Sequence, residues 1–263
     1  MQQPTTAITA TGIWTKGKGV RAWRSNAELI ALGVVGLGYL RPDDRVLDPT
    51  FGRGAWWKDW SPSVLVHHDI DQDGVDFRAL PYADGEFDVV AFDPPYVCTG
   101  GRETSTLGDF NDRYGLRDAP RTPEALLEMN VAGLGECWRV VAPGGLVLCK
   151  TANYVWSGHL YPGAHLTLEH ALSVTGFKLE DSFVYAGNVR AQPVRSRKRA
   201  ACSGSGIDSR PGNAHGEPRI VCGGAGRVQS AAAHARQNVS YLYVLRRPRS
   251  AKVVKGSPAL PLA

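Results

Sequence analysis

The stretch "VVAFDPPYVC", residues 89–98, carries a run of β-branched and apolar residues into an acid, two prolines and a tyrosine. The apolar half predicts a buried strand. Proline has no backbone N–H, so the strand must end where the two prolines begin. One proline suffices to end a strand, and neither a carboxylate nor an aromatic ring is needed for it. The stretch therefore indicates that the residues at this strand end have a chemical function.

Outward from this stretch, apolar strand patterns alternate with helical ones. Strands are predicted at 45–48, 63–69, 87–93, 145–151, 178–187 and 238–247. Helices are predicted at 25–40, 122–141 and 165–177. This order predicts an α/β fold, a Rossmann-like and mainly parallel sheet with helices on both faces.

Composition divides the 263 residues into one folded domain and three other segments. We predict the domain at 25–189 and 236–249, after an N-terminal segment at 1–24 that is rich in Gly and Thr. Between its two parts lies a basic insertion, 190–235, rich in Gly, Ser and Arg and without a core pattern. A tail follows at 250–263.

The net charge of +5 is unevenly distributed. Residues 190–255 hold 14 Lys and Arg against two acids, a net +12, which leaves −7 for the rest of the chain. A basic segment on an acidic body indicates a polyanionic partner, and it is equally typical of a solvated basic tail.

The apolar runs, the N-terminal residues and the cysteines exclude several classes of protein. No apolar run reaches the roughly 18 to 20 residues of a membrane span, so no membrane association is expected. The opening "MQQPTTAITATG" lacks the regions of a signal peptide, which favours a cytoplasmic location. Five scattered cysteines indicate neither a disulfide framework nor a zinc site, and no metal is expected.

Acids and glycines follow the first two predicted strands. Gly52 and Gly54 predict a tight loop where a ligand can approach the backbone. At Asp69, after the second strand, a carboxylate can accept both hydroxyl hydrogens of a ribose. A carboxylate at Asp76 can accept from an adenine amino group. Each residue alone is as typical of a turn or a solvated loop, but their order along the chain makes the combination informative.

Taken together, "VLDPTFGRG" and "ALPYADGEFDVVAFDPPY" resemble motifs of the class I S-adenosylmethionine-dependent methyltransferases, in particular the amino-methyltransferases with an Asp/Asn/Ser-Pro-Pro-Tyr signature. The resemblance spans roughly 12–183 and resumes at Val239, although the Lys-Pro usual near "SNAELI" is missing. It implies S-adenosyl-L-methionine as cofactor, with Asp71 as an alternative to Asp69 for the ribose. The cofactor-binding residues it implies are Asp48, Pro49, Thr50, Phe51, Gly52, Gly54, Asp69, Ile70, Asp76 and Phe77.

The resemblance also assigns catalysis to Asp93, Pro94, Pro95 and Tyr96. An exocyclic amino nitrogen is a poor nucleophile because its lone pair is delocalised into the ring. The Asp93 carboxylate would accept one N–H and the Pro94 carbonyl the other, with the prolines fixing that carbonyl. Tyr96 would stack on a base swung out of its helix. The methyl group would then transfer directly, without a covalent enzyme intermediate.

In the family that the motif resembles, Asp in the first position more often accompanies methylation of DNA at adenine N6, whereas Ser more often accompanies cytosine N4. Cytosine N4 in DNA and an amino group in tRNA or rRNA are the alternatives, and a non-catalytic nucleic-acid-binding protein is the alternative outside enzymes. "VRAQPV" and "HARQNVSYLYVLRR" resemble the ending of small Asp-Pro-Pro-Tyr methyltransferases. Lys150 is equally typical of an ordinary strand end, and His234 of a structural histidine. Candidate nucleic-acid contacts are Lys150, Arg190, Arg195, Arg197, Lys198, Arg199, His234 and Arg236.

Overall fold

The computed structural model describes residues 23, 25–96, 98, 120–156, 159–186 and 239–249. The insertion at 190–235 and the tail at 250–263 lie outside the described residues, as does the N-terminal segment apart from Trp23. The same holds for seven of the candidate nucleic-acid contacts, namely Arg190, Arg195, Arg197, Lys198, Arg199, His234 and Arg236.

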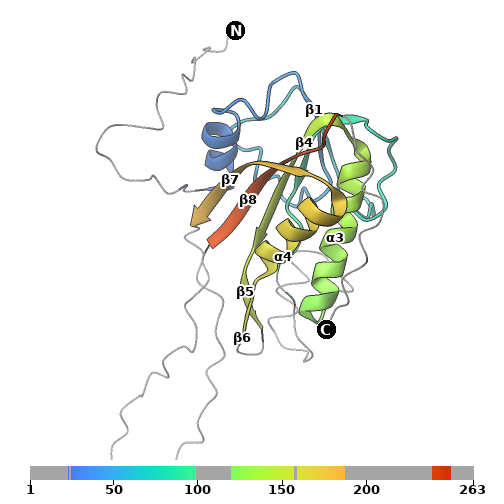
Figure 1. The fold of residues 1–263 in the computed structure, drawn as a ribbon. Coiled ribbons are helices and arrows are strands. Elements are labelled where there is room, and N and C mark those ends of the chain that lie inside the picture. Colours follow the sequence, from blue (N-terminus) through green and yellow to red (C-terminus); the bar gives the residue numbers. More distant parts are fainter. Residues whose placement is uncertain are drawn as a thin grey trace, which may run out of the picture.

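A six-stranded sheet with the order β2-β1-β3-β4-β8-β7 forms the centre of the molecule (Figure 1). Its strands are β1 (Arg45–Asp48), β2 (Val64–His67), β3 (Phe87–Phe92), β4 (Val141–Ala152), β7 (Lys178–Ala186) and β8 (Val239–Arg246). The first four strands pair in parallel, whereas β8 runs antiparallel between β4 and β7. The prediction of a Rossmann-like, mainly parallel sheet is confirmed.

Helices cover both faces of this sheet, also as predicted. On one face lie α3 (Pro123–Val140) and α4 (Gly163–His170), which continues as the π-helix η3 (Ala171–Thr175). The other face is covered by α1 (Asn26–Glu28) and the π-helix η2 (Leu29–Val34). Helix α3 begins where the sequence predicts, because the Thr122 hydroxyl accepts a hydrogen bond from the Ala125 N–H at 3.2 Å.

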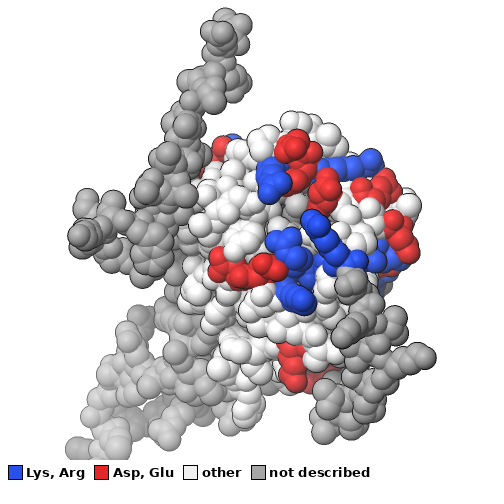
Figure 2. Space-filling view, turned by 45° about the horizontal axis from the view of Figure 1, so that its top comes forward, with Lys and Arg blue, Asp and Glu red and all other residues white. Residues whose placement is uncertain are grey.

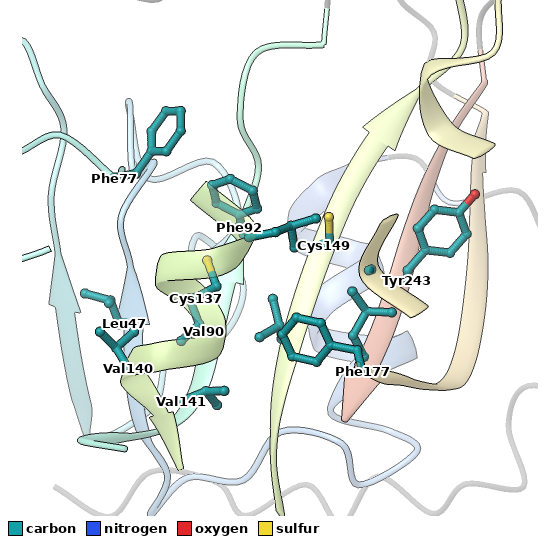
Figure 3. Close-up of a cluster of buried hydrophobic side chains, with 14 of the residues drawn as sticks. Leu47, Phe77, Val90, Phe92, Cys137, Val140, Val141, Cys149, Phe177 and Tyr243 are labelled. Carbon is teal, nitrogen blue, oxygen red and sulfur yellow. The ribbon is translucent and has the colours of Figure 1, made fainter. Parts of the chain in front are cut away.

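Alternate residues of the central strands face the two helical layers. On β3, Val90 and Phe92 belong to the cluster beneath α3 (Figure 3). Val89 belongs instead to the cluster beneath η2. Helix α3 lies close to the sheet at Gly133. A Cβ atom there would come within 2.6 Å of the rings of both Phe77 and Phe92.

Two predicted boundaries are wrong by several residues, and others differ by one or two. The first helix ends at Val34 rather than at residue 40, because the chain turns through Gly38, whose φ of +77° lies in the left-handed region. The expected break at 143–145 lies inside β4, which begins at Val141. Gly144, with φ of +90°, allows an irregularity there, and the pairing with β3 shifts register across it.

A short hairpin follows β4 that the sequence analysis did not predict. Its strands are β5 (Tyr154–Trp156) and β6 (His159–Tyr161), which pair antiparallel. The hairpin extends from the end of the sheet at which β4 ends (Figure 1). It therefore lies at the same sheet edge as the Asp-Pro-Pro-Tyr motif.

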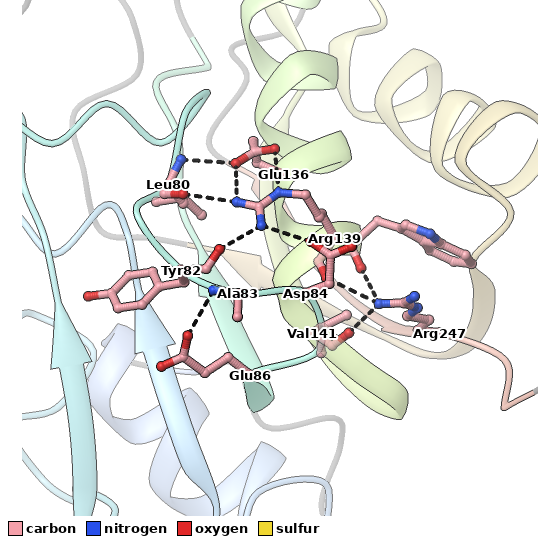
Figure 4. Close-up of polar contacts among 10 residues, drawn as sticks. Leu80, Tyr82, Ala83, Asp84, Glu86, Glu136, Arg139, Val141 and Arg247 are labelled. Carbon is pink, nitrogen blue, oxygen red and sulfur yellow. Dashed lines mark hydrogen bonds and ion pairs between the residues drawn. The ribbon is translucent and has the colours of Figure 1, made fainter.

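Arg139 of α3 fixes the loop that leads into β3 (Figure 4). Its guanidinium donates to the carbonyl oxygens of Leu80 at 2.9 Å and Tyr82 at 2.6 Å. It also pairs with Glu136 at 2.8 Å and Asp84 at 3.0 Å. Glu136 in turn accepts from the Leu80 N–H at 2.9 Å. The loop that leads into β3 is thus held against the helix layer.

Charges of both signs are interspersed on the face shown in Figure 2. Opposite charges pair directly, for example Arg45 with Glu86 at 2.6 Å and Arg246 with Glu180 at 2.8 Å. Among the described residues, no helix is both long enough and apolar enough to cross a bilayer.

Candidate active site

The strand order reverses between β1 and β3. The chain leaves β1 for β2 on one side and returns to β3 on the other. In open α/β sheets, ligands bind beyond the carboxyl ends of the strands at such a switch point. The loops that begin there are 49–54, after Asp48, and 93–96, after Phe92. The topology therefore brings the predicted cofactor loop and the Asp-Pro-Pro-Tyr motif to one place.

Asp48 and Thr50 join these two loops. The Asp48 carboxylate is buried and accepts hydrogen bonds from the Thr50 N–H at 3.0 Å and the Trp57 indole N–H at 2.8 Å. The Thr50 hydroxyl oxygen accepts from the backbone N–H of Asp93 at 2.9 Å. The first loop therefore supports the start of the motif directly.

Burial, the largest influence, raises the pKa of Asp48 from 3.8 to about 7, although hydrogen bonds from Trp57 and Thr50 oppose the change. The folded carboxyl then keeps its proton at pH values where the unfolded one has lost it. We expect this group's contribution to the free energy of unfolding, roughly 4 kcal/mol at most, to be present below pH 4 and lost as pH rises to about 7. Urea unfolding at pH 5 and pH 7.5 measures the part of this contribution that is lost between these two pH values.

Asp48→Asn is the control for this prediction, because an amide does not titrate. The fall in unfolding free energy between the two pH values should be smaller in the variant than in the wild type. An equal fall in both proteins would assign the pH dependence to other groups.

The glycine loop closes as the sequence predicts. Gly52 and Gly54 have φ values of +55° and +65°, in the left-handed region that favours glycine. A Cβ atom at Gly54 would come within 2.7 Å of the Phe51 ring. Phe51 itself stacks on His67 with ring centres 4.0 Å apart. The Gly52 N–H donates to Asp69 at 3.0 Å, which ties the loop to the end of β2.

Asp69 is better placed than Asp71 to bind a ribose. Among the described residues, its two carboxylate oxygens accept one hydrogen bond each, from the N–H groups of Gly52 and Asp71, at 3.0 Å in both cases. A carboxylate oxygen has about two acceptor positions. Asp69 can therefore accept two further hydrogen bonds while it holds the glycine loop. The Asp71 side chain is exposed, and none of the described hydrogen bonds joins it to that loop.

The remaining predicted cofactor residues differ in accessibility. Ile70 is 39% exposed, whereas Phe77 is buried with its ring centre 5.4 Å from that of Phe92. Asp76 is partly exposed and accepts from the Arg78 guanidinium at 2.6 Å, a pairing that lowers the pKa of Asp76. An adenine amino group that bound Asp76 would thus donate to a carboxylate that already accepts from Arg78. Phe77 instead packs in the core and supports the loop that carries Asp76.

The Asp93 side chain is held by two donors from other elements. The Trp56 indole N–H donates to Oδ2 at 3.0 Å, and the Lys150 ammonium lies 3.2 Å from both Oδ1 and Oδ2. Lys150 is buried, with 4% of its side chain exposed, whereas 23% of the Asp93 side chain is exposed. Lys150, predicted as a nucleic-acid contact, therefore lies within the hydrogen-bond network of the Asp-Pro-Pro-Tyr motif.

The two prolines are buried and anchored from α3. The Pro95 carbonyl accepts from the Asn130 side-chain amide at 3.0 Å, and the Asn130 Oδ1 has no hydrogen-bond partner among the described residues. Tyr96 follows, with its ring centre 5.2 Å from the Lys150 ammonium. Beside the motif is a shallow hollow, lined in part by Tyr96, Asn130, Thr151, Tyr154 and Tyr161.

Sequence reasoning did not find Trp56 or Asn130. Trp56 is an aromatic residue in a loop and Asn130 is an amide residue in a helix, and neither pattern is unusual. Only the tertiary fold brings them to the motif. Among the described residues, no group of three or more His, Cys, Asp or Glu is arranged to hold a metal ion.

The strand order, with antiparallel β8 between β4 and β7, together with the switch-point loops, gives a Rossmann-like fold. No protein-family model matches the sequence, and no curated protein matches it. Several solved structures are similar to this chain at low identity. A methyltransferase dependent on S-adenosylmethionine, from Methanosarcina mazei, is 10% identical over 82% of this chain and 98% of that chain, with a TM-score of 0.39.

Two further structures show the same level of similarity. A candidate methyltransferase from Bacillus halodurans is 13% identical over 82% of this chain and 97% of that chain, with a TM-score of 0.40. A candidate DNA modification methylase from Thermus thermophilus is 15% identical over 71% of this chain, with a TM-score of 0.35. The match spans 55% of the Thermus protein, which has also been solved with S-adenosyl-L-methionine.

Proposed function

We propose that this protein is an S-adenosyl-L-methionine-dependent methyltransferase that acts on an exocyclic amino group of a DNA base, in particular adenine N6. One observation carries the proposal. The partly exposed Asp93 begins an Asp-Pro-Pro-Tyr motif at the switch point of the sheet, next to the glycine loop. The motif and the loop are joined by the hydrogen bond from the Asp93 N–H to Thr50.

The residues at the glycine loop fit this cofactor. Asp69 has acceptor positions left for two ribose hydroxyls, and the backbone at Gly52 and Gly54 presents no side chain. When bound, S-adenosyl-L-methionine supplies a methyl group activated by its sulfonium. The loop's part is to hold the cofactor beside the motif.

The motif's part is to orient the amino group. The Asp93 carboxylate and the Pro94 carbonyl accept its two N–H bonds, so that the nitrogen lone pair faces the methyl group. Asn130 holds the neighbouring Pro95 carbonyl and restrains the dipeptide. Tyr96 stacks on the base, which must leave the duplex to reach this edge. The nitrogen would form its bond to the methyl carbon as the carbon–sulfur bond breaks, which releases S-adenosylhomocysteine, and the nitrogen would give up one proton to solvent. The amino group of the substrate is the nucleophile, so the protein supplies none.

Asp69→Ala should raise the KM for S-adenosyl-L-methionine by at least about 10-fold, because two hydrogen bonds to a charged group are lost. We expect kcat and the KM for DNA to stay within about threefold, since Asp69 lies on the cofactor side of the site. Initial rates at varied cofactor concentration measure this. Asp71→Ala is the matched control and should change the cofactor KM little. A larger effect from Asp71→Ala than from Asp69→Ala would transfer the ribose role to Asp71.

DNA is proposed as the partner partly on charge. The insertion at 190–235 is strongly basic, and Lys and Arg contacts to phosphates supply affinity without sequence information. The same motif geometry would also suit an RNA amino-methyltransferase or a cytosine-N4 enzyme. A non-catalytic nucleic-acid-binding protein would not require the partly exposed Asp93 carboxylate beside the glycine loop.

The experiment that tests the function incubates the protein with methyl-tritiated S-adenosyl-L-methionine and unmethylated genomic DNA, total tRNA or no nucleic acid. Labelled nucleosides are then identified after digestion. N6-methyladenine from DNA supports the proposal, and N4-methylcytosine corrects only the base. Label confined to tRNA favours the RNA alternative. Absence of label in every arm contradicts the assignment.

A further inference from the structure

A buried cation lies directly behind the motif. Lys150 is on β4, next to β3, and Cys149 pairs with Phe92 in the register of the two strands. The next residue on each strand is therefore a neighbour, which places Lys150 beside Asp93. Only 4% of the Lys150 side chain is exposed. A buried ammonium needs a partner, and the Asp93 carboxylate at 3.2 Å supplies it.

The hydrogen bonds to Asp93 leave one acceptor position for a substrate. A carboxylate has about four acceptor positions, two on each oxygen. Among the described residues, Oδ2 accepts from Trp56 at 3.0 Å and from Lys150 at 3.2 Å, whereas Oδ1 accepts from Lys150 alone at 3.2 Å. One position therefore remains on Oδ1. The two donors come from different elements of the fold, so they also fix the rotation of the carboxylate.

The same ammonium contacts the aromatic residue of the motif. It lies 5.2 Å from the centre of the Tyr96 ring, within the range of a cation–π interaction. Burial alone would lower the pKa of Lys150, but the Asp93 and Tyr96 side chains outweigh burial and raise it. Lys150 therefore stays charged at neutral pH and is bound to both Asp93 and Tyr96.

We propose that Lys150 and Trp56 are positioning residues that hold the Asp93 carboxylate with one acceptor position, on Oδ1, turned to the amino group, and that Lys150 also sets the ring of Tyr96. This role rests on the proposed function, because it concerns the same transfer step. It differs from the nucleic-acid contact that the sequence suggested for Lys150. A contact with DNA would require the ammonium to be accessible, and it is buried behind the motif.

The test uses Lys150→Met, which keeps the length of the side chain but removes its charge. A misplaced carboxylate should lower kcat about 100-fold while the KM values for cofactor and DNA stay within about threefold. Lys150→Arg should recover part of the lost kcat, because a cation again faces Asp93. Trp56→Phe, which removes one N–H and keeps an aromatic ring, should lower kcat about 10-fold.

Three results would overturn this role. Unchanged kcat in both Lys150→Met and Trp56→Phe would show that the donors do not position Asp93. A raised KM for DNA in Lys150→Met, with the slope of log affinity against log salt reduced by about one, would make Lys150 a phosphate contact. No transfer by the wild type under the same conditions would overturn the proposed function, and the role with it. If Lys150→Met does not fold, as judged by its thermal transition, the kcat of Trp56→Phe decides.

Discussion

Asp93→Asn should lower kcat for methyl transfer by about 1,000-fold while leaving the affinity for S-adenosyl-L-methionine within a few-fold. The amide keeps the shape of the carboxylate but replaces one acceptor oxygen with a donor and removes the charge that pairs with Lys150 at 3.2 Å. The amino group of the base then loses the acceptor that orients it. The backbone N–H of residue 93 still bonds Thr50, so the glycine loop keeps its support.

Asp88→Asn provides a matched control on the same strand. Asp88 is exposed and accepts from the Arg45 backbone N–H at 2.9 Å, away from the carboxyl end of β3. The kcat of Asp88→Asn should equal that of the wild type. Single-turnover label transfer with saturating cofactor separates the chemical step from binding. A transfer rate of Asp93→Asn within 10-fold of the wild-type rate would show that Asp93 does not take part in the reaction. Loss of cofactor binding in this variant would show that Asp93 has a structural role.

Gly133→Ala should destabilise the fold by at least about 2 kcal/mol, even though alanine is the better helix former. The added Cβ would come within 2.6 Å of the Phe77 and Phe92 rings, which are packed against each other beneath α3. Either the rings or the helix must move. Because Phe92 directly precedes Asp93, a displaced ring should also lower the transfer rate.

Gly135→Ala is the control for this variant. Gly135 is exposed on the same helix, and a Cβ there would meet no atom within 4 Å. Replacing it should stabilise the protein by about 0.5 to 1 kcal/mol through helix propensity. Urea unfolding of both variants should therefore give changes of opposite sign. Equal changes would mean that α3 is not in close contact with the sheet at Gly133.

Local patterns were enough to predict most of the sheet and the motif. The run at 89–92 is apolar and the residues after it cannot continue a strand, so β3 and its end follow from the sequence. The alternation of strands and helices gave the fold class for the same reason. The β5–β6 hairpin was missed although "YVWSGHLY" contains Ser-Gly between two short apolar runs, which is a turn signal.

The hydrogen-bond network of the site could not be predicted from local patterns. Lys150 is 57 residues from Asp93, and only the register of β3 with β4 makes them neighbours. Trp56 reaches the same carboxylate because the glycine loop folds back over the sheet edge. Asn130 has the spacing of a core residue on α3 and bonds Pro95 only through helix packing. Such contacts depend on tertiary structure, which periodicity does not contain.

The claim that this sheet edge is a methyl-transfer site depends first on its cofactor. Titration calorimetry of the purified wild-type protein with S-adenosyl-L-methionine tests that claim most directly. The account predicts saturable binding of one molecule per chain, displaced by S-adenosylhomocysteine and weakened at least about 10-fold in Asp69→Ala. No saturable binding up to millimolar cofactor, with or without DNA present, would contradict it.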